Sequence, residues 1–182
     1  MTSALPFACP GRYPSAVLLA LVPLAKARLI DVDDIVIDAK SGVTGAGRGL
    51  KQNTLFSEAG EGLSPYSVGT HRHAPEIEQG LSEAAGRPIV VNFTPHLMPM
   101  SRGILASIYV KLMPGVTVDQ LRTALIDRYR DEYFVKVLPN GSAPATARTA
   151  GAARSGRWRI ISGEGSTATT GRSVGSYDPA PA

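Results

Sequence analysis

Two of the chain's three histidines, His71 and His73, flank Arg72 directly ahead of an expected helix. Pro75 suits the first turn of that helix, because its fixed φ matches and its missing N–H would have no partner there. A helix N-terminus favours anions, and an imidazole can donate or accept a proton near neutral pH. The run therefore predicts a site for an anionic substrate with a proton-transfer group beside it.

Two other interpretations of these histidines stay open. The pair can be two surface histidines in a loop, or it can be half of a metal site. The only other soft or imidazole ligands in the chain are Cys9 and His96. Nothing shows the histidine and cysteine spacing of a zinc site, so we expect no metal.

A glycine-rich run over residues 40–48 follows an apolar strand candidate at residues 35–37. Its glycines let a backbone approach a phosphate closely, and Arg48 adds a positive charge. The run matches neither a P-loop nor the Rossmann spacing, so a flexible surface loop is the alternative interpretation. A third run, residues 9–15, opens an apolar helix.

Taken in this order, the runs resemble the N-acetyl-gamma-glutamyl-phosphate reductase family of arginine biosynthesis. The family pattern Asn-Pro-Gly-Cys-Tyr-Pro-Thr falls on residues 9–15, and Ser-Gly-x-Ser/Thr-Gly-Ala-Gly-Arg falls on residues 41–48. The pattern His-Arg/Lys-His-x-Pro-Glu-Ile falls on residues 71–77, and Phe-Thr-Pro-His-Leu-x-Pro-Met-x-Arg-Gly-Ile falls on residues 93–104. The likeness extends over residues 9 to about 147.

The resemblance implies that a cysteine thiolate attacks an acyl phosphate and expels phosphate, and that NADPH then reduces the thioester to an aldehyde. The substrate would be N-acetyl-gamma-glutamyl phosphate and the product N-acetylglutamate semialdehyde. The resemblance assigns proton transfer to His71 and the substrate pocket to Tyr66, Arg72 and His73. The nicotinamide and phosphate end of NADP(H) would contact one loop, namely Ser41, Gly42, Thr44, Gly45, Ala46 and Gly47.

The chain departs from the family at the nucleophile, because Arg12 occupies the position of the catalytic cysteine. An arginine with a pKa above about 12 has no nucleophilic form near neutral pH. Cys9, three residues upstream, would be displaced by up to about 10 Å, and an error of about 1 Å can cost 100-fold in rate. We therefore expect this copy to be inactive as a reductase.

The family carries a Rossmann domain ahead of the cysteine motif, whereas eight residues precede Cys9 here. We therefore expect the chain to bind NADP(H) weakly or not at all. The alternative function is a non-catalytic oligomerisation or anion-binding module, since Arg12 beside His71 and His73 would make an anion pocket. In either case we expect Arg12 and His71 to face each other across one cleft, with the loop of residues 41–48 on its rim.

The elements that must position these residues follow from periodicity and caps. Helices are expected from Pro14 to about Arg28, over residues 75–85, and after a capping box at residues 117–120. Strands are expected over residues 35–39, 66–68, 88–93, 104–112 and 134–138. This order predicts an α+β fold, a mixed β-sheet with helices on one face. Such a fold agrees with the second domain of the glyceraldehyde-phosphate and aspartate-semialdehyde dehydrogenases.

We expect three segments. Residues 1–12 would be a truncated remnant of the family's domain junction, and residues 13–145 the catalytic and dimerisation domain. Residues 146–182, rich in Ala, Gly, Ser and Thr, are expected to form a disordered low-complexity tail.

The net charge of +4 belongs mostly to the tail, which holds 5 basic and 2 acidic residues (5 − 2 = +3), against 14 and 13 before it (14 − 13 = +1). This distribution argues against specific nucleic-acid binding.

A single cysteine suits a reducing compartment. The apolar run at residues 16–24 is too short to span a bilayer, so we expect a cytoplasmic protein without a membrane partner. The resemblance implies a homo-oligomer formed through the sheet, and the sheet face bearing Leu105 and Tyr109 is the candidate interface. The other expected partner is a small-molecule acyl phosphate.

Overall fold

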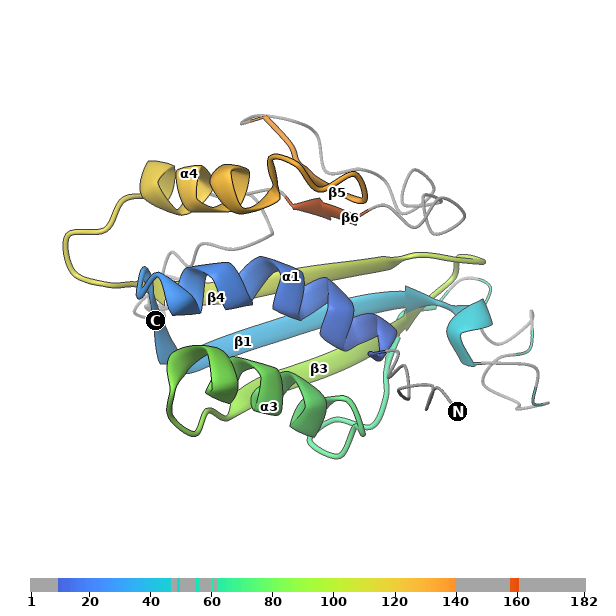
Figure 1. Cartoon of the computed structure of the whole chain (residues 1–182). Helices are drawn as coiled ribbons and strands as arrows, with labels where there is room; N and C mark the ends of the chain where they lie inside the picture. The colour runs from blue at the N-terminus through green and yellow to red at the C-terminus, as the bar shows by residue number, and fades with distance from the viewer. Residues whose placement is uncertain are drawn as a thin grey trace, which may run out of the picture.

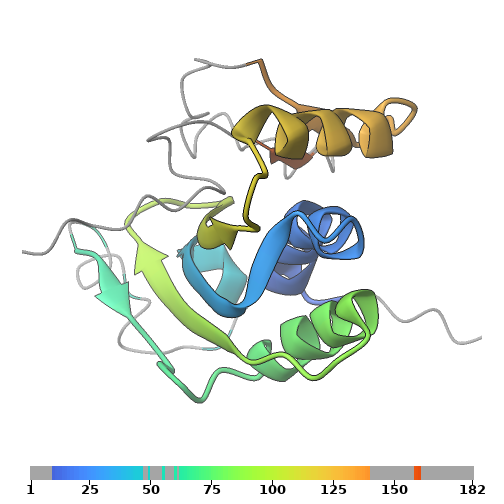
Figure 2. The same cartoon turned by 90° about the vertical axis from the view of Figure 1, so that its left-hand side faces the viewer.

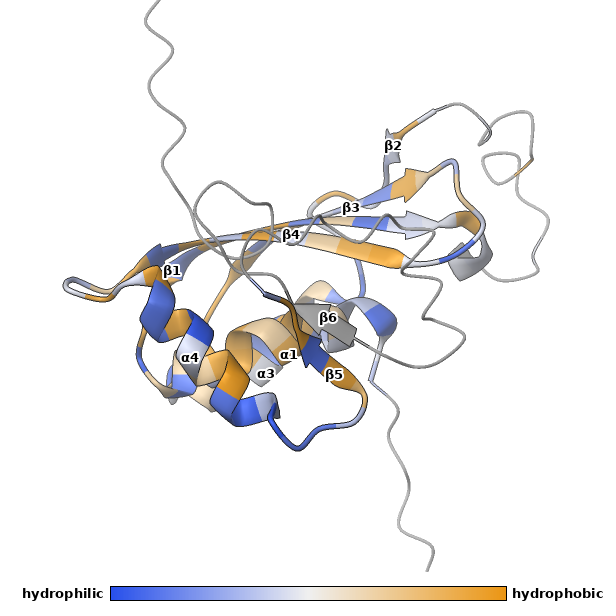
Figure 3. Ribbon diagram, turned by 90° about the horizontal axis from the view of Figure 1, so that it is seen from above, coloured by the Kyte–Doolittle hydropathy of each residue, from blue (hydrophilic) through white to orange (hydrophobic). Residues whose placement is uncertain are grey.

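The computed structural model describes residues 10–46, 62–139 and 158–160, together with Gly49, Leu55 and Gly60. Three helices cover one face of a mixed four-stranded sheet, which confirms the predicted α+β fold (Figures 1 and 3). The elements in chain order are α1 (Arg12–Lys26), β1 (Ile30–Gly42), the 3-10 helix η1 (Val43–Ala46), β2 (Ser64–Pro65), α3 (Ala74–Ala85), β3 (Val91–Met98), β4 (Ile104–Leu112), α4 (Val118–Tyr129), β5 (Val135–Val137) and β6 (Trp158–Ile160).

Strand β1 lies in the middle of the sheet, whose order is β2-β3-β1-β4. It pairs in parallel with β3 and antiparallel with β4, so Ile37 lies opposite Phe93 on one side and Ile108 on the other. All three side chains are buried. Because side chains alternate along a strand, this row defines the face that packs against the helices.

Helix α1 forms the centre of the helix layer, beside α3 (Figure 2). Its fully buried residues Val17, Leu21 and Leu24 recur at intervals of four and three, the spacing of one helix face. Helix α4 also contacts α1, and the hydroxyl of Tyr129 donates to the carbonyl of Leu19 at 2.6 Å. The apolar helix expected from the sequence is therefore confirmed, although it begins at Arg12 and ends at Lys26.

The predicted end of α3 and the predicted capping box of α4 are also confirmed. Helix α3 ends at Gly86, whose φ of 72° lies in the left-handed region that suits glycine. Helix α4 begins with the expected capping box: Thr117 N–H donates to the Gln120 side chain at 2.8 Å, and Gln120 N–H donates to the Thr117 hydroxyl at 3.4 Å. These short-range signals set the ends of the two helices.

Two strand predictions need correction. The strand expected at residues 66–68 is wrong, because β2 consists of Ser64–Pro65 and the chain turns at Ser67, where φ is 48°. The strand expected at residues 88–93 instead runs from Val91 to Met98, through Pro95. Since the neighbour β2 is only two residues long, β3 is nearly an edge strand there, where proline is tolerated.

Three residues of the segment expected to form the tail are described by the structure, and they form β6, which pairs in parallel with β5. Val135 lies opposite Trp158, the start of the apolar stretch in the tail. The other residues of the predicted tail lie outside the described part of the chain. Among the residues that the structure does describe, no helix has the length and apolar character needed to span a membrane.

The last residue of β1, Gly42, gives a stability prediction. A Cβ at this position would lie 2.6 Å from the backbone nitrogen of Arg102 and 2.7 Å from the carbonyl oxygen of Met100. Both are backbone atoms, so we expect Gly42→Ala to lower the free energy of unfolding by about 1–3 kcal/mol. Urea denaturation measures this, with Gly49→Ala as the control because no atom of the described residues lies within 4 Å of a Cβ there. Equal losses for the two variants would contradict the prediction.

Candidate active site

The starts of α1 and α3 meet at one end of the helix layer (Figure 1). Gly11 is the N-cap of α1, and His73 is the N-cap of α3. The N–H of Gly11 donates to the Glu76 carboxylate at 2.8 Å. This hydrogen bond joins segments 65 residues apart and holds the two helix starts together.

The His73 ring lies so close to Gly11 that a Cβ at this position would force neighbouring side chains to shift. A Cβ at position 11 would lie 2.7 Å from Nε2 of His73 and 3.0 Å from the Glu76 carboxylate. The absence of a side chain therefore lets the His73 ring lie directly against the backbone at the start of α1. As a result, residue 12 and both histidines belong to one cluster.

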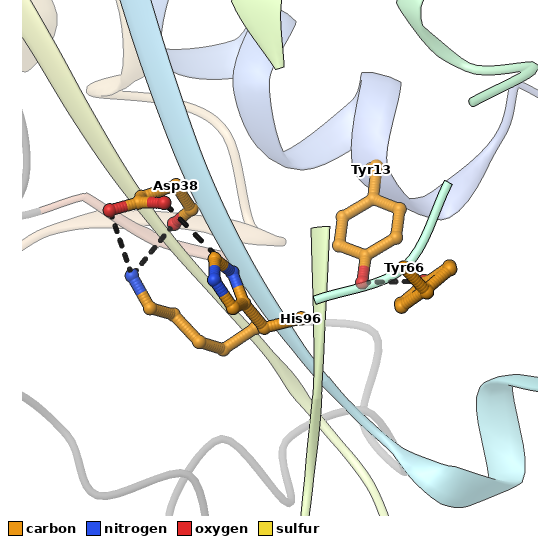
Figure 4. Close-up of polar contacts among 5 residues, drawn as sticks. Tyr13, Asp38, Tyr66 and His96 are labelled. Carbon is orange, nitrogen blue, oxygen red and sulfur yellow. Dashed lines mark hydrogen bonds and ion pairs between the residues drawn. The ribbon is translucent and has the colours of Figure 1, made fainter. Parts of the chain in front are cut away.

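Aromatic rings surround the histidine pair. The Tyr13 ring makes edge-on contacts with His71, His73 and Phe93, at centroid distances of 5.7, 5.9 and 5.3 Å. His71 also contacts Tyr66 at 5.5 Å, and the two histidine rings are 4.8 Å apart. The hydroxyls of Tyr13 and Tyr66 share a hydrogen bond of 2.9 Å (Figure 4). These contacts hold the His71 ring in place.

Burial lowers the pKa of both histidines. For His71, the charges of His73 and Arg72 lower the pKa further. For His73, the Glu76 carboxylate opposes the effect of burial, while Arg72 and Arg12 reinforce it. Since the ordinary value is about 6.5, both imidazoles are neutral at pH 7. Burial also raises the pKa of Tyr13, which remains a neutral phenol.

A backbone hydrogen bond decides which nitrogen of His71 carries the proton. The N–H of His73 donates to Nδ1 of His71 at 3.1 Å, so Nδ1 must be the unprotonated nitrogen of the neutral ring. The hydrogen then lies on Nε2, and His71 can donate through that atom. Protonation of Nδ1 would remove this hydrogen bond, so the hydrogen bond also favours the neutral ring.

The Arg12 side chain reaches from the start of α1 to the loop after β1, where it donates to the carbonyl oxygen of Gly45 at 3.2 Å. Within the described residues, no carboxylate lies within ion-pair distance of Arg12 or of Arg72. Both arginines are exposed. The cluster therefore carries more positive than negative charge, with Glu76 as the carboxylate that contacts it.

The expected cofactor loop is held by its own contacts. Ser41 is buried at the end of β1 and hydrogen-bonds the Tyr13 side chain. The N–H of Gly42 donates to the carbonyl of Gly103, and both the N–H and the hydroxyl of Thr44 donate to the carbonyl of Ser101. These donors are already hydrogen-bonded within the protein, so the loop offers mainly its backbone near Gly45 to a ligand.

The remaining expected cofactor residues are only partly placed. Ala46 ends η1, and Gly47 lies outside the described residues, as do Arg48 and Cys9. Of the other expected residues, the structure brings Arg12, Tyr66, His71 and His73 together, and Arg72 acts on both imidazoles through its charge. No interaction joins Arg12 directly to His71 in the described structure, so the cleft between them stays a prediction.

Tyr13 and Glu76 are site residues that sequence reasoning missed. Tyr13 follows Arg12 in the same motif, so its position was a usable signal. Glu76 occupies the third position after its N-cap His73, where a carboxylate commonly caps its own helix; here it binds the N–H of Gly11 at the start of another helix.

His96 lies apart from this cluster, in strand β3 (Figure 4). It faces Asp38, whose carboxylate lies 3.9 Å from Nδ1 of His96 and 3.6 Å from the Lys40 ammonium. Because Asp38 and Lys40 alternate with the buried residues of β1, these polar groups belong to the sheet face opposite the helices. No cluster suited to hold a metal ion occurs among the residues that the structure describes.

We expect the fold to lose stability as the pH falls below about 6.5. Because the folded-state pKa values of His71 and His73 are lowered, the unfolded chain binds more protons in this range. The stabilisation is complete above the unfolded value of about 6.5 and is lost as the pH falls through the folded values. Urea denaturation between pH 5 and 7.5 should show this slope, and His71→Asn with His73→Asn should flatten it. An unchanged slope in the double variant would show that His71 and His73 do not cause the pH dependence of stability.

The sequence model of the semialdehyde dehydrogenase dimerisation domain matches residues 12–156. The N-acetyl-gamma-glutamyl-phosphate reductase of Rhodospirillum rubrum is 56% identical over 144 residues, which are 79% of this chain and 41% of that protein. The probable chloroplastic N-acetyl-gamma-glutamyl-phosphate reductase of Arabidopsis thaliana is 55% identical over 142 residues, 78% of this chain and 35% of that protein. The chain thus spans about two fifths of the length of these relatives.

Solved structures show the same fold. Aspartate semialdehyde dehydrogenase II from Vibrio cholerae has a TM-score of 0.58 and 16% identity, and the match covers 76% of this chain and 47% of that one. The aspartate semialdehyde dehydrogenase with NADP from Candida albicans has a TM-score of 0.58 and 12% identity, covering 84% and 46%. At these identities the likeness concerns the fold alone. Together with the matched sequence model, it shows that the chain belongs to the semialdehyde dehydrogenase dimerisation-domain family.

Proposed function

We propose that the chain corresponds to the catalytic and dimerisation part of an NADP-dependent N-acetyl-gamma-glutamyl-phosphate reductase, and that this copy has lost its nucleophile. The observation that carries the proposal is the meeting of residue 12, at the start of α1, with His71 and His73, at the start of α3. The names of relatives 51–56% identical to the chain support the choice of substrate. A cytoplasmic location is part of the same proposal.

The position of residue 12 suits a nucleophilic cysteine. A thiol at a helix N-terminus loses its proton more readily, because the helix dipole stabilises the thiolate. In the proposed reaction the thiolate sulfur forms a bond to the acyl carbon of N-acetyl-gamma-glutamyl phosphate, and the bond to phosphate breaks. Reduction of the resulting thioester by hydride, with one proton, releases the semialdehyde and restores the thiol. Arg12 can perform neither step.

The described side chains suggest how the substrate would be held. Neutral His71 would donate from Nε2 to the acyl oxygen and supply the proton, while its ring is fixed by Tyr13 and Tyr66. Arg72 is exposed and without a carboxylate partner in the described structure, so it can meet an anionic group of the substrate. His73 lies against the start of α1, close to the reacting position.

The loop after β1 fits a limited contact with NADP(H), the group that supplies the hydride when bound. Among the described residues, the nearest atoms to a Cβ placed on Gly45 are side-chain atoms of Ser41 and Arg12, at 3.8 and 3.9 Å. Gly45 can therefore approach a cofactor closely. The hydrogen-bond donors of Gly42 and Thr44 already bind carbonyl groups within the protein. Most of the free energy of NADP(H) binding would therefore come from contacts outside this loop.

A restored thiol tests the nucleophile position. In a Cys9→Ser background, we expect Arg12→Cys to give a thiol with a pKa below the free value of about 8.5. The rate of alkylation by iodoacetamide against pH reports this pKa. His71→Asn should slow alkylation near neutral pH, whereas the matched change His96→Asn should not, since His96 lies apart from the cluster. Equal effects of the two histidine changes would contradict the role of His71.

Turnover tests the proposed function itself. The segment of the Rhodospirillum rubrum reductase that precedes the matched region would be fused ahead of residue 10, with and without Arg12→Cys. We expect NADPH oxidation dependent on the acyl phosphate only in the fusion with Arg12→Cys. Turnover with Arg12 intact would show that another nucleophile operates. No turnover from a folded Arg12→Cys fusion with a low thiol pKa would overturn the reductase proposal.

The second candidate, a non-catalytic oligomerisation module, is favoured by the open face of the sheet. No described helix covers this face (Figure 3), and Val36, Leu105 and Tyr109 remain 37–38% exposed on it. Val36 lies directly opposite Tyr109, and Leu105 directly opposite Lys40. We propose that this face binds a second copy of the chain, as the name of the family suggests.

We expect Tyr109→Glu to shift the chain toward the monomer, because two buried carboxylates would meet near the interface at the cost of their hydration. Sedimentation velocity across a concentration series measures the change. Ile126→Glu on α4 is the matched control, since Ile126 is equally exposed at 37% but belongs to the helix layer. An undiminished oligomer in Tyr109→Glu would exclude this face as the interface.

A further inference from the structure

Three hydroxyl groups run in a chain from the loop after β1 toward the histidine pair. We propose that Ser41, Tyr13 and Tyr66 are positioning residues that act as one unit. Together they make the orientation of the His71 imidazole depend on the conformation of that loop. The inference deepens the proposed function, because it takes the loop as the NADP(H) contact and His71 as the proton-transfer group.

The chain begins at Ser41, in the interior of the protein. Ser41 lies in β1 next to the last residue of the strand, and its exposed fraction is 7%. Its hydroxyl oxygen lies 3.8 Å from a Cβ placed on Gly45, so it is close to the backbone of the loop. Its side chain hydrogen-bonds Tyr13. A serine buried in this way is poorly placed to contact a cofactor directly, and it acts on the site through Tyr13.

Tyr13 forms the middle of the chain. It is buried near the start of α1, and its hydroxyl lies 2.9 Å from that of Tyr66 (Figure 4). Burial raises the pKa of Tyr13, so the phenol keeps its proton. The hydrogen bond to Ser41 acts to lower this pKa, as a donor does, and the bond to Tyr66 acts to raise it, as an acceptor does. The donation therefore runs from Ser41 through Tyr13 to Tyr66.

Tyr66 brings the chain to the histidine. Its backbone N–H donates to the carbonyl of Pro95 at 3.0 Å, and the chain turns at the next residue, Ser67. In the described part of the chain, the Tyr13 hydroxyl is the hydrogen-bond partner that holds the Tyr66 hydroxyl. The Tyr66 ring lies edge-on to the His71 ring, at a centroid distance of 5.5 Å. Loss of the hydroxyl bond would therefore loosen the Tyr66 ring against the imidazole.

The His71 imidazole should register this loosening through its own pKa. Burial is the main cause that lowers this pKa, ahead of the charges of His73 and Arg72. A looser ring admits water, so the pKa should rise toward the ordinary value of about 6.5. The titratable groups that face the imidazole are Tyr13 from α1, Tyr66 from the segment after β2, and Arg72 and His73 ahead of α3.

The test is a pH titration of the histidine-ring NMR signals in the whole chain. We expect Tyr13→Phe, which keeps the ring and removes the hydroxyl, to raise the pKa of His71. Tyr66→Phe should do the same, because it removes the same hydrogen bond. Ser41→Ala should also raise it, although no interaction joins Ser41 directly to His71 in the described structure. In a Tyr13→Phe background, Ser41→Ala should have no further effect, as expected for residues that act as one unit.

Two matched controls separate positioning from general stability. Tyr129→Phe removes another buried phenol hydroxyl, which donates to the carbonyl of Leu19 at 2.6 Å in a different part of the helix layer. Ser107→Ala removes another buried serine hydroxyl, in β4. Both should leave the titration of His71 unchanged, and the amide spectrum verifies that each variant is folded. Equal shifts in Tyr129→Phe and Tyr13→Phe, or no shift in Tyr13→Phe and Ser41→Ala, would overturn the inference.

Alkylation links the chain to the proposed chemistry. In the chain carrying Cys9→Ser and Arg12→Cys, we expect Tyr13→Phe to slow alkylation near neutral pH by about tenfold, less than the roughly 100-fold that a misplacement of about 1 Å can cost. With His71→Asn also present, Tyr13→Phe should cause no further slowing.

The two measurements distinguish the inference from the proposed function. Alkylation that ignores His71→Asn, together with a shifted His71 titration in Tyr13→Phe, would support the hydroxyl chain and contradict the proposed role of His71. Alkylation that responds to His71→Asn but not to Tyr13→Phe, together with an unshifted titration, would overturn the hydroxyl chain and leave the proposed function intact.

Discussion

One hydrogen bond, from the N–H of Gly11 to the Glu76 carboxylate, holds together the part of the molecule on which the site depends. It joins the first residue before α1 to the first turn of α3, and the lack of a side chain at Gly11 lets His73 pack against the same backbone. The helix layer makes this meeting possible, because α1 and α3 lie side by side on the buried face of the sheet. Residue 12 and both imidazoles are positioned as a consequence.

Close packing also sets the chemical character of the cluster. Tyr13, Tyr66 and Phe93 enclose His71, and burial keeps its ring neutral. The backbone N–H of His73 selects the tautomer that donates from Nε2. A neutral donor near the Arg72 guanidinium suits the recognition of an oxyanion, whether the anion is then attacked or only held. In the proposed function, the residue at position 12 would decide between these outcomes, because a thiolate can attack an acyl carbon and a guanidinium cannot.

The two faces of the sheet differ in character because the side chains of β1 alternate between them. Ile35, Ile37 and Ala39 are buried under the helices, whereas Asp38 and Lys40 lie on the open face with His96. The open face thus combines apolar groups with charged ones, as in interfaces that form between folded subunits. The site and the proposed interface occupy opposite faces of the same strand, so each can be altered by substitution without directly touching the other.

Sequence alone determined the features whose signals are short-range. Thr117 and Gln120 mark the start of α4, Gly86 marks the end of α3, and the alternation along residues 104–112 predicts β4. The four motifs identified the family, and the first of them shows that Arg12 occupies the position of the family's cysteine. Both conclusions depend only on the order of residues along the chain. Caps, periodicity and motifs involve neighbours within a few residues, so they can be recognised without coordinates.

Only the tertiary structure decided the features that depend on distant segments. The chain turns at Ser67, where a strand was expected over residues 66–68. Strand β6 pairs with β5, although no strand was expected in the tail. The tautomer of His71 and the bond between Gly11 and Glu76 likewise follow from how the helix starts pack. Each of these depends on burial and on partners brought together by folding, and no local pattern of residues encodes such contacts.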